Sequence, residues 1–521
     1  MKLRSPSSKH KMACVSYVYI SNCRLKVKHL YMLFLLIVLF SVALLSIIAH
    51  YNSLKYVWEE IDLLHKLDPD EGVIQERFQE RWGYFMSEEE REQWKINDQS
   101  ELRMKELDDG SYHDFEVDRV AAPVINSIQH AEKEELPFLL WWTPFTGDQA
   151  KIKQCWEGKC LFSQNQSLYD HPLTKAFFFY GTDFHEDKVP LPRKAHHEWA
   201  LLHEESPKNQ PLFFYEDTLG LFNHTSTFKQ QSSYPISTQY VKSEKYILNP
   251  LKYSVHEKDE FKLKHGLAPV VFIQSGCNPP SDRDSYVQEL MKHIKIDSYG
   301  KCLHNKDLPK EYQSATTMHN KGFIEFLQKY KFMISFENAI CDDYMTEKIF
   351  RTLNVGAVPI YKGAPNIQEW LPNSHSAIVV DDFKSPKELA DFILHLDTHP
   401  KEYEKYLEYK RSGITNSKLN KTLQERQWGV DTVYKMSFIT GFECHVCDQI
   451  HRNKKRVAEG LKPIEHKANI EHYGCPAPKK YDLPPINGAE DWERETWLWE
   501  YNDAAKRSAI LKEKVLSSLK V

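Results

Sequence analysis

Two segments of the chain combine cationic side chains with the start of a predicted helix. One is Ser275–Arg283, a loop rich in polar residues and Pro that follows the apolar run Val270–Ile273. The other is Glu337–Lys348, which follows the apolar run Phe332–Phe336. A helix N-terminus presents free backbone N–H groups, and a neighbouring Arg or Lys adds positive charge. The two segments therefore indicate a site for a phosphate-bearing molecule. An ordinary helix with an exposed Glu-Lys pair is the alternative for the second segment.

Several large enzyme classes lose support because their motifs are missing. The chain has no GxxxxGK[ST], GxGxxG, HExxH or GxSxG sequence, which argues against phosphate-loop ATPases, ordinary dinucleotide enzymes, zincins and hydrolases of the GxSxG type. Its 521 residues are 41% hydrophobic and 27% charged, with a net charge of −5. This composition is typical of a globular protein of two or three domains and has no basic footprint for nucleic acid. We expect no nucleic-acid partner.

Both cationic segments lie in a block of alternating apolar runs and amphipathic stretches. Besides the two runs above, we expect strands at Val358–Tyr361 and Ile378–Val380, and helices from Tyr286, over Tyr344–Leu353 and over Pro386–Leu396. This alternation indicates βαβ units and a parallel sheet. Residues 256–400 are therefore predicted to form a Rossmann-like domain, with both segments at the carboxyl ends of strands, where open α/β sheets bind ligands.

The rest of the chain divides into three further parts beyond its N-terminal 49 residues. Residues 136–255 are expected to form another Rossmann-like domain, with strand-like runs at Phe138–Trp142, Ala176–Tyr180 and Pro211–Tyr215. Residues 50–135 are acidic and polar and predict a stem. Residues 401–521 are helical, charged and Trp-rich, and predict an extension, containing a CxxC sequence, that packs back on the body. The predicted fold class is α/β, with two Rossmann-like domains facing a cleft.

An uncharged run of 20 residues, Leu30–Ala49, is long enough to cross a bilayer as a helix. Residues 1–28 contain seven Lys or Arg and no acid. The positive-inside rule therefore predicts a cytosolic tail over residues 1–29, a transmembrane signal anchor over residues 30–49, and a luminal remainder. A cleaved signal peptide is the alternative, but no A-x-A site follows the run. We expect a single-pass type II protein of the Golgi or endoplasmic reticulum membrane.

Two further features are consistent with a luminal location. Three glycosylation sequons begin at Asn165, Asn223 and Asn420. Eight Cys follow the predicted span, and the close pairs Cys155/Cys160 and Cys444/Cys447 predict disulfides in an oxidising compartment. A zinc site of Cys444, Cys447 and Cys475 with His472 is the alternative, but it lacks the second ligand pair that makes such sites specific.

The run Phe336–Ile393, which contains FENAICDDYMTEKIF, closely resembles the donor-binding signature of the alpha-1,3-fucosyltransferase family. Upstream, Ser275–Tyr286 and Asp297–Gly300 are similar to that family's S-N-x-N-P…R-x-x-Y and Y-G elements. The resemblance covers roughly residues 137–450. It implies a GT-B fold, GDP-fucose as the donor substrate, inversion at the anomeric carbon, and no cofactor or essential metal.

The resemblance also implies roles for individual donor-side residues. Arg283 and Lys348 match the family's cationic partners of the diphosphate, where fixed positive charge stabilises the leaving group. Asn338, Tyr344 and Glu347 match positions that hold the nucleotide and the fucose. The pairs Asp342-Asp343 and Asp381-Asp382 invite a metal interpretation, which we decline because each pair is adjacent rather than D-x-D and GT-B enzymes do not require a metal.

An inverting transfer needs a base that removes the proton of the acceptor hydroxyl. The segment from Trp199 to Pro207, WALLHEESP, resembles the family's W-x-W-M-x-x-E-S-P element, whose Glu is the base. This assigns the catalytic role to Glu205, with Glu204 and His203 as near alternatives. The segment Leu221–Lys229 is similar to the family's F-N-x-T-x-T-Y-R run and supports the same alignment.

The acceptor side departs from the family pattern. Phe179–Asp183 replaces an F-H-H-R-type run, and Ala200 and Leu202 stand at two aromatic-rich positions. With the C-terminal extension, this resembles the divergent branch called alpha-1,3-fucosyltransferases ten and eleven, also described as GDP-fucose protein O-fucosyltransferases. Loss of aromatic stacking favours Ser or Thr of disulfide-rich luminal protein domains as the acceptor over GlcNAc of N-glycans. A non-catalytic luminal binding protein is the alternative of another class.

Overall fold

The computed structural model describes residues 116–313, 318, 320–430, 435–484 and 491–519, all within a compact unit that spans Gly110–Val521. The predicted tail, the anchor Leu30–Ala49 and most of the stem lie outside the described residues. Within the described ranges, no helix is both long and apolar enough to cross a membrane.

The first sheet has six strands in the order β2-β3-β1-β4-β5-β6. Their bounds are β1 Phe138–Trp141, β2 Lys151–Gln154, β3 Lys159–Ser163, β4 Thr174–Tyr180, β5 Glu198–His203 and β6 His224–Thr227. All neighbours are parallel except β2, which is antiparallel to β3. The central strands are buried on both faces, as their continuous apolar sequences require. Two of the predicted strands, at Phe138 and Ala176, are thereby confirmed.

The predicted strand at Pro211–Tyr215 is wrong. The chain there forms the 3-10 helix η4, Pro211–Phe214, with Pro at its first position and the side chain of Gln210 accepting a hydrogen bond from Leu212 N. Leu212 and Phe213 are fully buried. The apolar run therefore belongs to the core, but in a helical conformation. A short buried run is compatible with either a strand or a helix, so its sequence pattern alone does not distinguish them.

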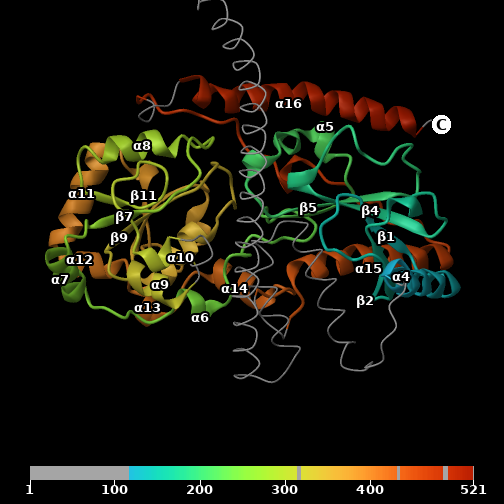
Figure 1. Cartoon of the computed structure of the whole chain (residues 1–521), viewed down its shortest axis with the longest axis horizontal. Helices are drawn as coiled ribbons and strands as arrows, with labels where there is room; N and C mark the ends of the chain where they lie inside the picture. The colour runs from blue at the N-terminus through green and yellow to red at the C-terminus, as the bar shows by residue number, and fades with distance from the viewer. Residues whose placement is uncertain (1–115, 314–317, 319, 431–434, 485–490, 520–521) are drawn as a thin grey trace, which may run out of the picture. The chain divides into compact units, whose positions relative to one another are not determined.

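The second sheet has five parallel strands in the order β11-β10-β9-β7-β8. Their bounds are β7 Val270–Phe272, β8 Ile296–Ser298, β9 Phe332–Phe336, β10 Val358–Lys362 and β11 Ile378–Val379. The helices α7 Val255–His265, α8 Arg283–Leu290, α9 Lys321–Leu327, α10 Glu347–Val355 and α11 Pro386–Thr398 flank or connect them. All four strands expected in this half are confirmed (Figure 1).

Helix α10 begins three residues later than predicted. Thr346 is its N-cap, so Tyr344 lies in the preceding loop rather than on the helix. The helix ends at Gly356, whose φ of 67° is the left-handed conformation that favours glycine. Ser385 caps α11, and its side chain accepts a hydrogen bond from Glu388 N.

The C-terminal residues form several elements rather than one tail. Helices α12 Pro400–Lys405, α13 Tyr409–Ser412 and α14 Ser417–Glu425 contribute Tyr403, Tyr409 and Leu419 to the core of the second sheet. Helix α15, Phe438–Ala458, lies against β5, and α16, Asp491–Ser518, lies along η4 and the short helix α5, Glu216–Leu219 (Figure 1). The first half therefore obtains much of its cover from the end of the chain.

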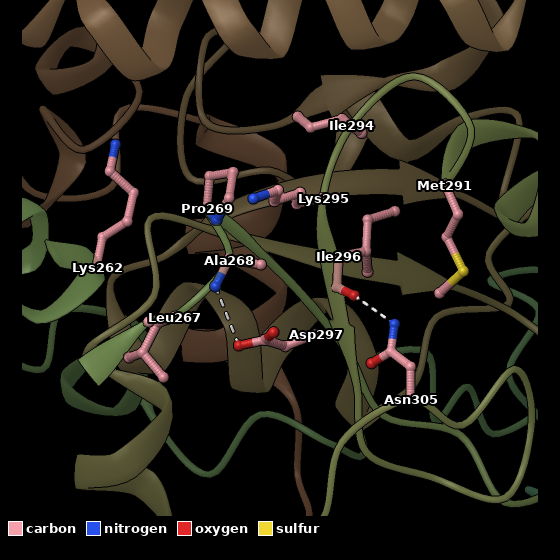
Figure 2. Close-up of a pocket in the computed structure, with 11 residues that line it drawn as sticks. Lys262, Leu267, Ala268, Pro269, Met291, Ile294, Lys295, Ile296, Asp297 and Asn305 are labelled. Atoms are coloured by element: carbon pink, nitrogen blue, oxygen red, sulfur yellow. Dashed lines mark hydrogen bonds between the residues drawn. The ribbon is translucent and has the colours of Figure 1, made fainter. Parts of the chain in front are cut away.

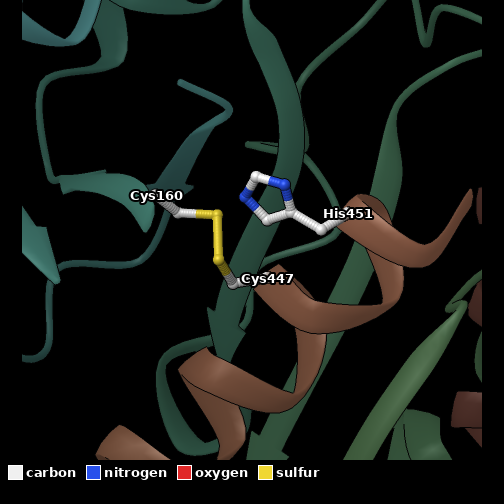
Figure 3. A group of neighbouring side chains, drawn as sticks. All are labelled: Cys160, Cys447 and His451. Carbon is white, nitrogen blue, oxygen red and sulfur yellow. A yellow bond between two sulfur atoms is a disulfide. The ribbon is translucent and has the colours of Figure 1, made fainter. Parts of the chain in front are cut away.

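The predicted pairing of four cysteines is wrong, although all four form disulfides. Cys155 bonds to Cys444 and Cys160 bonds to Cys447, so both bridges join the β2–β3 hairpin to α15. Figure 3 shows the second of them. The register explains this, because Cys160 faces Lys153 across the hairpin, not Cys155. Cys444 and Cys447 are one helical turn apart and therefore share a face of α15. Cys277–Cys302 and Cys341–Cys475 are also bonded.

Removal of both bridges to α15, Cys155–Cys444 and Cys160–Cys447, by Cys→Ala at all four positions is expected to destabilise the protein by about 2–5 kcal/mol, because the two bridges together close one long loop of the unfolded chain. Thermal unfolding of the full chain measures this. The matched control is the Cys277–Cys302 double variant, whose loop is much shorter, with a sequence separation of 25 against 287. A larger loss of Tm in the control would contradict the expectation.

Candidate active site

Glu205 lies directly beyond the carboxyl end of β5, between the parallel neighbours β4 and β6. Successive side chains of β5 point to opposite faces of the sheet and therefore to two different hydrophobic cores. Leu201 and His203 face the core that contains Phe213, whereas Ala200 and Leu202 face the core beneath α15. Glu205 comes after the strand and remains half-buried. It is the member of the His203–Glu205 triplet with the most solvent access.

The two alternative bases are less accessible. His203 is fully buried between Phe213 and Tyr473, and burial lowers its pKa to about 3, so its imidazole is neutral. Glu204 is 5% exposed and accepts a hydrogen bond of 3.1 Å from the hydroxyl of Tyr180. This geometry favours Glu205 as the group that meets an acceptor.

The Glu204 carboxyl predicts a pH dependence of stability. Burial raises its pKa from 4.5 to about 7, with a further contribution from the charge of Glu205. The folded state holds this proton more tightly than the unfolded chain, so the free energy of unfolding falls as the pH rises from 4.5 to about 7. Glu204→Gln removes that loss, which is on the order of 3 kcal/mol.

We therefore expect Glu204→Gln to raise Tm relative to wild type more at about pH 8 than at about pH 5. Thermal unfolding at both pH values measures this. Glu198→Gln, at the start of the same strand, is the control. An equal change of Tm for Glu204→Gln at both pH values would show that the carboxyl does not titrate as described.

Arg283 is almost completely buried at the first position of α8 and organises the loop before it. Its Nη1 donates to Phe336 O at 2.9 Å and to Asn338 Oδ1 at 2.7 Å. Its Nη2 donates to Gln274 Oε1 and Gly276 O, both at 2.8 Å. The guanidinium thus ties together the two segments predicted to bind phosphate. All four terminal N–H groups are used in doing so.

The start of α10 is built on a buried carboxylate that sequence reasoning did not single out. Glu337 is fully buried, and its two oxygens accept hydrogen bonds of 2.8 Å from Thr346 N and Thr346 Oγ1. Lys348 Nζ lies 3.4 Å from Glu337 Oε2, 3.2 Å from Glu347 Oε1 and 2.9 Å from Thr346 Oγ1. Glu337 therefore fixes both the helix cap and the ammonium of Lys348.

Glu347 is the first residue of α10. Burial alone would raise the pKa of its carboxyl, but the charges of Lys348 and Arg351 outweigh this and lower it to about 2. Glu347 is accordingly a fixed anion beside the Lys348 cation. Such an arrangement suits recognition of a neutral hydroxyl group or a developing positive charge.

The two halves meet where the predicted residues lie. The side chain of Tyr344, 3% exposed, lies close to that of Ser206, the residue after Glu205. Next to it, Gln230 donates to both oxygens of Asp343 through its N and Nε2, at 3.2 and 2.5 Å. The structure therefore brings Glu205 to the same region as Arg283, Asn338, Tyr344, Glu347 and Lys348, the predicted donor-side residues.

The sequence did not predict three residues that lie in this region. Burial lowers the pKa of the Lys208 ammonium, and the charges of Arg283, Glu205 and Lys348 also affect it. Tyr473 is fully buried, which raises the pKa of its hydroxyl, and Tyr344 and Glu205 raise it further. Trp497 on α16 donates through Nε1 to Asn278 O at 2.7 Å. Lys208 follows Ser-Pro in the same loop as Glu205, and that position was the available signal. The other two come from the end of the chain and had none.

The aspartate pairs have structural partners. Asp343 is almost fully buried and also accepts hydrogen bonds from Asn366 and Trp370, and Asp381 pairs with Lys362. The described residues contain two groups with metal-ligand spacing, and in each a disulfide joins the two sulfurs: Cys160, Cys447 and His451 (Figure 3), and Cys277, Asp284 and Cys302. The zinc alternative is wrong for the same reason, because Cys444, Cys447 and Cys475 are all disulfide-bonded.

The three sequon asparagines differ in their surroundings. Asn223 is held at both ends of its amide, with Oδ1 accepting from Arg193 and from Trp199 N, and Nδ2 donating to His466 O at 2.9 Å. Asn165 caps the 3-10 helix η1, Gln166–Leu168, and Asn420 accepts a hydrogen bond from Gln424 on α14. Glycosylation stays a prediction at all three.

A pocket of about 640 Å³ lies at the amino ends of strands of the second sheet, away from the loops that carry Arg283 and Lys348 (Figure 2). It is lined by residues that precede or begin β7 and β8, among them Ala268, Lys295 and Asp297. Asp297 already accepts hydrogen bonds from Ala268 N, Lys306 and Tyr330. Because open α/β sheets bind their ligands at the carboxyl ends of the strands, this pocket is not the candidate site.

Profiles of known protein families match both halves of the chain. The profile of glycosyltransferase family 10 (fucosyltransferase), C-terminal part, matches residues 262–465, and the fucosyltransferase N-terminal profile matches residues 133–240. Proteins named GDP-fucose protein O-fucosyltransferase 3 are 44% identical over 75% of this chain and 82% of the Canis lupus familiaris protein, and 44% identical over 73% of this chain and 80% of the Homo sapiens protein.

A crystal structure of alpha1,3-fucosyltransferase with GDP aligns with a TM-score of 0.35 and 18% identity, over 60% of this chain and 90% of that chain. The family assignment rests on the sequence matches, which span both halves of the site. The chain is a glycosyltransferase and belongs to glycosyltransferase family 10, the fucosyltransferases.

Proposed function

We propose that this protein transfers L-fucose from GDP-fucose to Ser or Thr hydroxyls of folded, disulfide-rich protein domains, with inversion at the anomeric carbon. The observation that carries the proposal is the convergence of Glu205 with the donor-side residues around Arg283 and Lys348. The names of the relatives, GDP-fucose protein O-fucosyltransferase 3, support a protein acceptor.

The residues fit a single displacement. The Glu205 carboxylate removes the proton from the acceptor hydroxyl, and the hydroxyl oxygen forms a bond to C1 of fucose as the bond from C1 to the diphosphate breaks. The electron pair of that bond leaves with GDP. Lys348 and Arg283 place positive charge where the diphosphate gains negative charge, which stabilises the transition state. The mechanism needs no metal, because these fixed cations take that role.

One argument for a protein acceptor does not survive the structure. Ala200 and Leu202 are both fully buried in the core beneath α15. Neither position faces an acceptor, so the loss of aromatic residues there says nothing about stacking on a sugar. Support for a protein acceptor comes from the relatives instead. GlcNAc of N-glycans is the alternative acceptor.

The proposed cellular setting rests on the sequence alone. The apolar run Leu30–Ala49, with its basic N-terminal flank, supports a single-pass type II anchor in the Golgi or endoplasmic reticulum membrane, with the catalytic part in the lumen. Four disulfides in the described residues suit an oxidising compartment.

The test uses the purified full-length chain with labelled GDP-fucose and EDTA, offered a panel of folded disulfide-rich domains and a biantennary N-glycan. Label on a protein Ser or Thr is the expected result. Label on GlcNAc alone would replace the protein acceptor by the N-glycan. GDP binding without transfer to any acceptor would favour a non-catalytic binding protein.

A further inference from the structure

Lys208 is a half-buried cation that forms no direct ion pair among the residues that the structure describes, although the charge of Glu205 acts on it. It lies in the 3-10 helix η3, Pro207–Asn209, three residues after Glu205, and the side chain of Ser206 caps that helix by accepting from Lys208 N. The side chain of Ser206 in turn lies close to that of Tyr344, in the loop before α10. The backbone that carries Lys208 is therefore held against the segment that carries Lys348.

The Lys208 side chain also lies near Trp497 of α16. Its Nζ lies 6.0 Å from the ring centroid of Trp497, at the outer limit of a cation–π contact, and Trp497 Nε1 donates to Asn278 O at 2.7 Å. Asn278 belongs to the loop that Arg283 organises and is bonded through its N to Asp284. Lys208 thus stands between the two donor-side segments, although it belongs to the acceptor-side half.

The charges around Lys208 are of the same sign. Burial lowers the pKa of its ammonium, and the cations of Arg283 and Lys348 lower it further, against the opposing effect of Glu205. Three converging cations repel one another unless an anion lies between them. The other two cations are also largely engaged, since Arg283 spends its terminal N–H groups on the protein and Lys348 contacts Glu337 and Glu347. Of the three cations, Lys208 has the fewest contacts with protein groups, so its ammonium can add a direct contact to an anion that Arg283 and Lys348 also attract.

We propose that Lys208 is a further donor-binding residue that contacts the diphosphate of GDP-fucose, with Trp497 as the positioning residue that orients its ammonium. This rests on the proposed function, because it takes GDP-fucose as the donor. Lys208 on the Glu205 loop, and Arg283 and Lys348 beside the second sheet, would then contact the same diphosphate. Donor binding would therefore also position the loop that carries the base Glu205. Helix α16 lies beyond the residues matched by the family profiles, which end at residue 465.

The test is calorimetric titration of the full-length chain and its Lys208→Ala variant with GDP and with guanosine. We expect Lys208→Ala to weaken GDP binding by about 10- to 100-fold, the usual effect of losing one charge-assisted contact, and to leave guanosine binding unchanged. The matched control is Lys194→Ala. Lys194 also lies over an aromatic ring, that of Tyr169, but pairs with Asp170 away from the donor loops.

The outcomes separate the two levels of the argument. Absence of GDP binding by the wild type would overturn the proposed function itself. Equal GDP affinity of wild type and Lys208→Ala, or an equal loss for guanosine, would overturn the assignment of Lys208. Trp497→Ala and the double variant complete a cycle, in which the effect of Lys208→Ala should shrink when Trp497 is absent. Full additivity would contradict the positioning role of Trp497.

Discussion

Glu205→Gln is expected to lower fucosyl transfer by about 10²–10⁴-fold, the usual contribution of a general base, while GDP binding is retained. The glutamine amide has nearly the shape of the carboxylate but cannot accept the proton of the acceptor hydroxyl. The side chain of Ser206 lies close to that of Tyr344, and an isosteric change at Glu205 leaves this packing of the two halves in place. Initial rates of transfer from labelled GDP-fucose, together with calorimetric titration by GDP, measure the two properties separately.

Glu204→Gln is the matched control for this variant. It changes the adjacent carboxyl, which is 5% exposed and hydrogen-bonded to Tyr180. Transfer by Glu204→Gln should stay within severalfold of wild type, since its main effect is on stability. If Glu204→Gln abolished transfer and Glu205→Gln did not, the base would be Glu204 rather than Glu205.

Lys348→Ala is expected to lower kcat by about 10²–10³-fold, comparable to the loss of one preorganised donor that stabilises developing negative charge. The side chain is 12% exposed and is held by Glu337 and Thr346, so its position is set before the donor arrives. The variant also leaves the buried Glu337 carboxylate without its cation, which predicts a lower Tm. Steady-state kinetics with saturating GDP-fucose and thermal unfolding measure both effects.

Lys348→Arg separates the charge from the fold. It keeps a cation near Glu337 and should recover most of the Tm but only part of kcat, because a planar guanidinium does not match the geometry of an ammonium. Lys387→Ala, an exposed lysine of α11 paired with Asp391, is the surface control. Wild-type kcat in a stably folded Lys348→Ala protein would remove Lys348 from the leaving-group site.

The candidate site could be predicted largely from local sequence. The apolar runs before Glu337 and Ser275 identified β9 and β7, and the loops after the carboxyl ends of parallel strands lie at one edge of a sheet. The resemblance then named Arg283, Asn338, Tyr344, Glu347 and Lys348, which the structure gathers with Glu205. These features depend on short stretches of chain, because each needs only a strand, a turn and the first turn of a helix.

Contacts between distant parts of the chain were decided only by the packing. Proximity in sequence predicted the wrong cysteine pairs. The β2–β3 register and the spacing of one turn on α15 place Cys155 against Cys444 and Cys160 against Cys447 instead. The alternation of side chains along β5 buries Ala200 and Leu202 in the core beneath α15. The absence of aromatic residues at these positions therefore gives no information about the acceptor. Trp497 reaches Asn278 across 219 residues, and no local pattern marks either residue as a partner of the other. A sequence pattern reports which positions are buried, but not against which residue, since that depends on how all the elements fit together.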